Sequence, residues 1–216
     1  MAVRESGIAS FNPSPMRSLP RRPVCSVEPE AELVVLVDGR DRRVGVAPKM
    51  AAHIYGWRHR ALSVFVINDR HELLLQKRSP AKYHSGGLWS NTCCGHPRPG
   101  ERVARAAKRR LQEEMGFACR LHRIGAIQYS IDVGNGLVER EYLHLFAGRW
   151  NGQPVPAADE VCNWRWCAPS AIDALIVTQS ARFTPWFGLA WPHVKHSLQV
   201  GVFRPAKSIA AIRIPS

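Results

Sequence analysis

The sequence predicts an α+β fold in a single domain, in which mixed β-sheets are flanked by a few helices. The chain has 216 residues, of which 45% are hydrophobic and 22% charged, as is typical of one domain with a sizeable core and tails. Segments with strand patterns come in pairs around turn residues, and helical patterns interrupt them only occasionally. Paired strands without a repeated βαβ order indicate α+β architecture.

The first half of the chain is dominated by predicted strands. Residues 32–46 read as two short strands around an Asp-Gly turn. Residues 48–57 begin with proline and predict a short helix. Residues 61–78 predict a hairpin that turns at an Asn-Asp pair. Residues 79–100 are rich in Gly, Ser and Pro and predict a long loop, a kind of segment that often carries function.

The clearest helix is predicted over residues 100–117, where Gly116 ends the pattern. Its predicted apolar stripe consists of Ala104, Ala107, Leu111 and Met115. Residues 124–150 then predict a second hairpin around a Gly-Asn-Gly turn. The remaining elements are a strand over residues 160–168, a helix over 169–177, and a segment over 185–203 that begins as a helix.

The domain organisation is expected to be simple. Residues 1–30 are rich in Pro, Ser and Arg and are expected to be a disordered extension, with an organelle transit peptide as the alternative. Residues 31–192 form the predicted domain, and residues 193–216 a basic tail. No apolar run of transmembrane length occurs, and no signal peptide fits. Six cysteines without framework spacing favour reduced thiols and a cytoplasmic location.

The charge of the chain indicates an anionic partner. The formal net charge is +13, which makes an RNA-binding module one hypothesis. The basic residues are scattered, however, and aromatic residues do not interleave with them as on a base-stacking surface. A small polyanion such as a diphosphate is an equal candidate from charge alone. We expect no nucleic-acid partner, no membrane partner and a monomer.

Two groups of residues could carry chemistry. Arg110 and Glu114 are four apart on the predicted helix and share a face, as an exposed ion pair or as a site for a cation and a phosphate oxygen. Glu139 and Glu141 are two apart on a strand and project from one face, whereas His144 has the opposite parity. Two carboxylates with several imidazoles would suit magnesium or manganese. The candidate imidazoles are those of His53, His59 and His96.

The segment from residue 95 to residue 117 resembles the Nudix box. It agrees at Gly95, Glu101, Arg109, Leu111, Glu113, Glu114, Gly116 and Phe117. The one departure is Arg110, which stands where the family has a glutamate. In Nudix hydrolases the glutamates of this helix bind magnesium, so the departure removes a metal ligand and adds a donor for a diphosphate. The resemblance therefore favours holding a diphosphate over cleaving it.

The order of the motifs extends this resemblance. The chain contains "KMAAH", "RHRALSVFVIND", "KRSPAKYHSGGLWSNTCCGHP", the arginine variant of the Nudix helix, "VEREY" and "TPW". Together they resemble the type I isopentenyl-diphosphate isomerases over about residues 33–190. The resemblance implies a Nudix-like fold and the interconversion of isopentenyl and dimethylallyl diphosphate. Only five residues separate His53 from His59, one fewer than in those relatives, so a local loop adjustment is expected.

The resemblance also implies a set of site residues. The residues implied to act in catalysis are Cys94, Glu141, Tyr129 and Trp186, with Cys93 as a structural neighbour of the thiol. Those implied to contact the diphosphate are Lys49, Arg78, Lys82 and Arg110. Manganese or magnesium would be bound by His53, His59, His96, Glu139 and Glu141. A second ion, magnesium, would bridge Glu114, the backbone carbonyl of Cys94 and the substrate diphosphate. The alternative is a Nudix hydrolase of a nucleoside diphosphate derivative.

Overall fold

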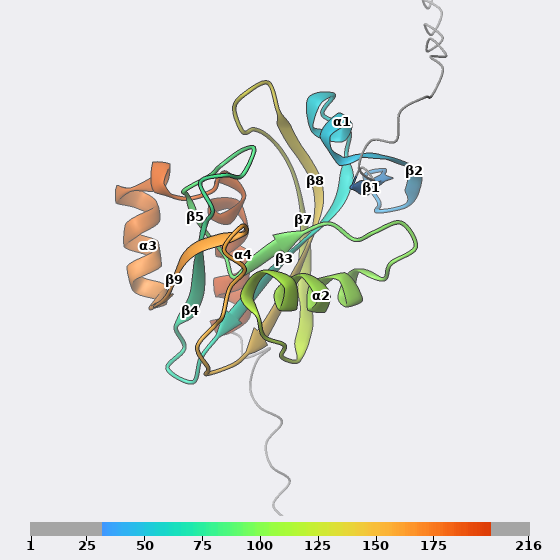
Figure 1. Cartoon of the computed structure of the whole chain (residues 1–216). Coiled ribbons are helices and arrows are strands. Elements are labelled where there is room, and N and C mark those ends of the chain that lie inside the picture. The colour runs from blue at the N-terminus through green and yellow to red at the C-terminus, as the bar shows by residue number, and fades with distance from the viewer. Residues whose placement is uncertain (1–31, 200–216) are drawn as a thin grey trace, which may run out of the picture. The chain divides into compact units, whose positions relative to one another are not determined.

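The computed structural model describes residues 32–199 (Figure 1), and within them it confirms the predicted α+β class. The strands are β1 (Leu33–Val37), β2 (Arg43–Pro48), β3 (His59–Ile67), β4 (Leu73–Arg78), β5 (Trp89–Ser90), β6 (Cys93–Gly95), β7 (Leu121–Asp132), β8 (Val138–Arg149) and β9 (Val161–Cys167). The helices are α1 (Lys49–Ile54), α2 (Val103–Met115), α3 (Pro169–Thr178), the 3₁₀ helix η1 (Ser180–Arg182) and α4 (Pro185–Gln199). No helix in this part of the chain is long and apolar enough to span a membrane.

Strand β3 is the centre of the sheet. The sheet has two halves, one built from β3 and its partners and the other from β4 and its partners. Strand β3 pairs in parallel with β8 along its full length and antiparallel with β6. Strand β4 instead pairs with β9 and β5. The predicted hairpin over residues 61–78 therefore exists only at its turn, because the Ile67–Leu73 pair is the one at which β3 and β4 meet. Beyond that pair the strands diverge, and a cavity opens between the two halves.

Helices cover both faces of β3, which is why this strand is a nearly continuous apolar run. Val64 lies in a core cluster with Leu111 of α2. Phe65 points the other way into a cluster with Phe187 of α4, and the two rings stack with centroids 6.4 Å apart. Figure 1 shows α2 on one side of β3, with α3 and α4 on the other. Each fully buried large side chain stabilises the fold by about 1.5–3 kcal/mol.

The buried face of α2 differs from the predicted stripe. Ala107, Leu111 and Met115 are buried as expected, but Ala104 is exposed and Ala106 is buried in its place. The reason is Glu114, a carboxylate that belongs to the buried face. The prediction assigned only apolar residues to the buried face. It therefore left out Glu114 and included Ala104 by mistake.

Two other predictions required correction. The loop over residues 79–100 contains the short strands β5 and β6, whose pattern is hidden among Gly, Ser and Pro. The folded part also continues past residue 192, because α4 runs to Gln199 with Pro192 inside it and Val194 in the core. The expected extension over residues 1–30 and the end of the expected basic tail lie outside the described residues.

The end of α2 supplies a test of the packing. Gly116 has φ +75°, and a methyl group on it would lie 2.3 Å from the carbonyl oxygen of Val155. Gly116→Ala should therefore lower the free energy of unfolding by about 2–4 kcal/mol, from backbone strain and the clash together. Gly100 has φ +82° with nothing near its Cβ position, so Gly100→Ala should cost only about 1 kcal/mol. Equal losses in urea denaturation would contradict this account.

Candidate active site

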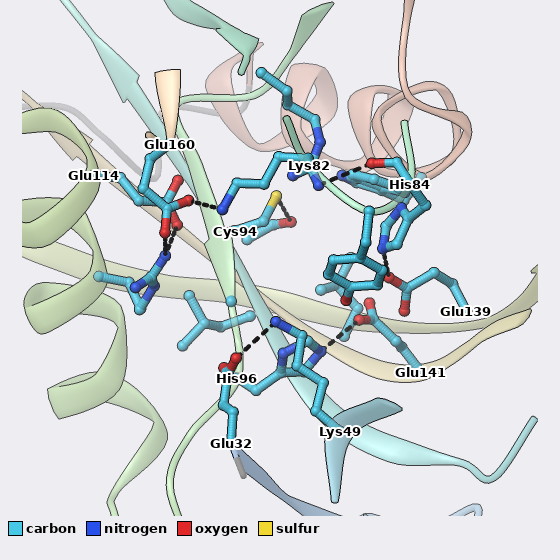
Figure 2. Close-up of a pocket in the computed structure, with 18 of the residues that line it drawn as sticks. Glu32, Lys49, Lys82, His84, Cys94, His96, Glu114, Glu139, Glu141 and Glu160 are labelled. Carbon is cyan, nitrogen blue, oxygen red and sulfur yellow. Dashed lines mark hydrogen bonds and ion pairs between the residues drawn. The ribbon is translucent and has the colours of Figure 1, made fainter. Parts of the chain in front are cut away.

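The cavity between the two halves of the sheet has a volume of about 140 Å³. It is smaller than the roughly 300 Å³ at which drug-sized ligand sites begin, so it suits a small ligand. Its walls come from β3, β4, β6, β7 and β8, together with α2 and α4. Figure 2 shows carboxylates and basic groups at one end, and histidines with a carboxylate pair at the other.

The carboxylate pair comes from β8. Glu139 and Glu141 face the same way because side chains alternate along a strand, and each is only 5% exposed. The parallel register of β3 and β8 places His59 directly beside Glu141. His144 points away, as its parity predicted, and its Nε2 lies 3.0 Å from Asp41 Oδ2. Two buried carboxylates require positive neighbours, since an unpaired buried charge is costly.

Three histidines converge on this pair from different elements. His53 on α1 donates its Nδ1 proton to the carbonyl of Lys49 at 2.6 Å, and His59 donates its own to the carbonyl of Trp57 at 2.9 Å. These bonds orient both rings so that their Nε2 atoms face the carboxylates. His96 follows β6, and its Nε2 lies 3.1 Å from Glu141 Oε1.

The cluster fits a divalent metal ion. One ligand atom from each of four side chains lies within 4.8 Å of the others, and the four residues are His53, His59, His96 and Glu139. The Nε2 atoms of the first two and Oε2 of Glu139 are buried without hydrogen-bond partners. Burial disfavours protonated His59, but Glu139 and Glu141 outweigh it and raise its pKa to about 10. The centre thus favours positive charge. Glu141 borders this group through its contacts with His59 and His96.

His84 was missed by the sequence analysis. Its ring is buried, with Nε2 3.0 Å from Glu139 Oε1. It also packs edge-on against Trp186, with ring centroids 5.7 Å apart. His84 lies within the motif "KYHSGGLW", in a segment predicted to be a loop. A loop has no side-chain periodicity from which its position near Glu139 could be predicted. Through these contacts His84 links the metal-binding cluster to the aromatic wall of the cavity.

Glu141 is held by an aromatic hydroxyl. The side chain of Tyr129 donates a hydrogen bond to Glu141 Oε2, across the register pair that joins β7 to β8. Burial and the adjacent carboxylate raise the pKa of Tyr129 well above its usual value. The phenol therefore keeps its proton. Its hydroxyl lies where it can form hydrogen bonds to both the carboxylate and a ligand.

The two adjacent cysteines separate as predicted. Cys93 faces the core under α2, and Cys94 lines the cavity together with Glu141. Burial raises the pKa of Cys94 to about 11, so the sulfur carries its proton at neutral pH. Trp186 covers the same cavity from α4, with its ring 5.3 Å from the guanidinium of Arg78.

The basic residues predicted to contact a diphosphate line the same cavity, and three of the four are paired with acids. Lys82 lies near Glu114 and Glu160, at the end away from the histidines (Figure 2). Lys49 and Glu32 lie beside His96 instead (Figure 2). Lys49 Nζ lies 2.8 Å from Glu32 Oε2, and Lys82 pairs with Glu160. Arg110 lies 2.6 Å from Glu114 and 3.1 Å from Glu160, which confirms that Arg110 and Glu114 share a face. Glu32 and Glu160 were not predicted as site residues, because neither belongs to a recognisable motif.

Comparison with solved structures identifies the fold. The structure of DR0079 from Deinococcus radiodurans superposes with a TM-score of 0.64 at 18% identity, over 74% of this chain and 98% of that one. The MutT protein from Methanosarcina mazei superposes with a TM-score of 0.54 at 14% identity, over 66% and 96% of the two chains. The Nudix domain family matches residues 57–187. The fold and the α2 helix thus define a Nudix protein.

Curated relatives narrow this class. The Isopentenyl-diphosphate Delta-isomerase of Burkholderia multivorans is 47% identical over 156 residues, covering 72% of this chain and 89% of the relative. The enzyme of the same name from Halorhodospira halophila is 51% identical over 159 residues, covering 72% and 91%. The chain belongs to the isopentenyl-diphosphate Delta-isomerase family of Nudix proteins.

Removing one carboxylate tests the metal-binding cluster. Glu139→Gln replaces a charged ligand oxygen with a neutral one, so the affinity for Mn²⁺ should fall at least about 10-fold in isothermal titration calorimetry. Asp173→Asn is the matched control, because Asp173 pairs with Lys195 on the α3 and α4 side of the molecule and should leave the affinity unchanged. Wild-type affinity in the Glu139 variant would remove this residue from the ligand set.

Proposed function

We propose that this protein interconverts isopentenyl diphosphate and dimethylallyl diphosphate by moving one proton onto the alkene and another off the carbon chain. The observation that carries the proposal is the placement of Cys94, Glu141 and Tyr129 around one small cavity under Trp186. The sequence relatives that bear the isomerase name support the same reaction. An unactivated alkene has no carbonyl to polarise, so the reaction requires an acid and a base at opposite positions.

The two proton-transfer groups stand on opposite sides of β3. Cys94 belongs to β6 and Glu141 to β8, and these strands pair with different edges of β3. A five-carbon tail between them would receive a proton at its terminal alkene carbon and lose one from the carbon next to the diphosphate-bearing carbon. The intermediate is a tertiary cation, and no charge or atom is left over at the end. Tyr129, bonded to Glu141, is positioned to relay the proton on that side.

The cation requires a dry, electron-rich wall. Trp186 is buried in the cavity, and an indole face stabilises a desolvated cation by about 2 kcal/mol or more. Exclusion of water matters because water would trap the cation as an alcohol. A hydrolase must instead admit water to the diphosphate. Arg110 in place of a metal-binding glutamate also disfavours the hydrolase alternative.

The diphosphate would be held by Lys49, Arg78, Lys82 and Arg110 through charge-assisted hydrogen bonds. We assign magnesium to Glu114, the carbonyl of Cys94 and the diphosphate, and manganese or magnesium to the cluster of His53, His59, His96, Glu139 and Glu141. When bound, the metal ion in the cluster supplies positive charge that makes groups hydrogen-bonded around it more acidic. The proposal further includes a monomer in the cytoplasm without nucleic-acid or membrane partners, consistent with the five unpaired cysteines among the described residues.

The reaction itself can be tested directly. Purified protein with Mg²⁺ and Mn²⁺ should convert isopentenyl diphosphate to dimethylallyl diphosphate without releasing phosphate, because Cys94, Glu141 and Tyr129 line the cavity as proton donors and acceptors. Products are separated by chromatography, and phosphate is measured in the same samples. Phosphate release without the isomer would establish the hydrolase instead.

Exchanging each cysteine separately tests the assignment of the thiol. Cys94→Ala should lower kcat at least about 100-fold, the usual contribution of a positioned acid or base, while the melting temperature stays within a few degrees. Cys93→Ala makes the same chemical change in the core next to it and should cost some stability but little activity. An inactive Cys93 variant beside an active Cys94 variant would reverse the assignment.

A further inference from the structure

The sulfur of Cys94 lies within a chain of hydrogen bonds and has a buried partner on each side. The register of β3 and β6 places Ser63 opposite Cys94, and Ser63 Oγ lies 3.3 Å from Cys94 Sγ. On the other side, Asn91 Oδ1 lies 3.2 Å from the same sulfur. Ser63 and Asn91 are both fully buried, so each contact to the sulfur is made without competing solvent.

The orientation of the Asn91 amide is determined by its other bonds. Its Nδ2 group donates to the carbonyl of Val64 at 3.1 Å and to the carbonyl of Cys93 at 2.8 Å. A flipped amide would place its oxygen against two carbonyl oxygens, which is repulsive. The atom that faces Cys94 is therefore the oxygen, which can only accept a hydrogen bond.

This orientation determines the direction of every other bond in the chain. The sulfur has one proton, and because Asn91 Oδ1 can only accept, that proton is donated to Asn91. Ser63 must then donate to the sulfur, since no second thiol proton exists. Beyond Asn91, Ser90 donates to Oδ1 at 3.1 Å, and Thr184 of the "TPW" motif must donate to Ser90 at 2.9 Å.

We propose that Asn91 and Ser63 are positioning residues for Cys94, each suited to one state of the sulfur during turnover. This inference rests on the proposed function. When the sulfur holds its proton, Asn91 Oδ1 accepts it and orients the thiol. When the proton has moved to the substrate, the negative sulfur keeps the hydrogen bond that Ser63 donates. The step balances because the sulfur becomes one proton poorer and the substrate one proton richer. The proton that the resulting cation loses passes to Glu141 and Tyr129 on the other side.

The hydroxyl of Ser63 is the part of this network that can be removed cleanly. Ser63→Ala deletes one donor and leaves the Asn91 amide with all its partners. The hydrogen bond from Ser63 is stronger to a negative sulfur than to a thiol, so its loss costs more after the proton has left than before. We therefore expect kcat to fall about 10- to 100-fold with KM within about twofold. Ser63→Thr restores the hydroxyl on a residue suited to a strand and should recover most of the lost kcat.

The matched control is Ser197→Ala, which removes a buried hydroxyl that bonds the carbonyl of His193 on α4. It should leave kcat and KM unchanged. Melting temperatures and the binding of inorganic pyrophosphate, measured by calorimetry, report whether each variant keeps its fold and its diphosphate site.

The outcomes separate the two proposals. If the wild type isomerises isopentenyl diphosphate and Cys94→Ala is inactive, the proposed function holds whatever Ser63→Ala does. Wild-type kcat in Ser63→Ala would then overturn the positioning role alone. So would a loss of kcat accompanied by weaker pyrophosphate binding, or a folded Ser63→Thr as slow as Ser63→Ala. A wild type without isomerase activity overturns both.

Discussion

The structure depends on the burial of two carboxylates on β8. Glu139 and Glu141 lie beside β3 in a parallel register that brings His59 next to Glu141. An isolated pair of buried negative charges would be destabilising by several kcal/mol, so the surrounding elements supply positive or polar partners. Three of these partners are histidines from a helix and two loop segments, namely His53, His84 and His96. Tyr129 donates a hydrogen bond to Glu141 Oε2. The same arrangement makes the centre attractive to a cation.

The cavity is polarised along its length. One end has the imidazoles and the two strand carboxylates, with the Lys49–Glu32 pair beside His96, and the other has Lys82 with Glu114 and Glu160. A ligand with a diphosphate at one end and hydrocarbon at the other suits this cavity, because only its anionic end can replace the acids that pair with the basic side chains. The apolar end then lies between Cys94, Glu141 and Trp186.

Much of this could be predicted from sequence, for identifiable reasons. Period-two alternation placed Glu139 and Glu141 together and excluded His144, and helical spacing paired Arg110 with Glu114. The adjacent cysteines also separated as expected. What periodicity could not supply was the role of residues outside regular patterns. His84 lies in a segment without alternation, and the orientation of the Asn91 amide depends on hydrogen bonds that only the fold creates. Glu114 is buried although it is a charged residue type, which a sequence pattern does not anticipate. The predicted buried face of α2 therefore included Ala104 instead.

The parallel pairing of β3 and β8 has a consequence for biosynthesis. Parallel strands require a crossover, and here β4 to β7 and α2 lie between the two partners in sequence. Contacts between such distant segments form slowly because a long loop must first close. On the ribosome, the segments with His53, His59 and His96 emerge well before β8. The metal-binding cluster can close only after most of the chain has been synthesised, so a nascent chain carries its imidazoles for some time without their carboxylates.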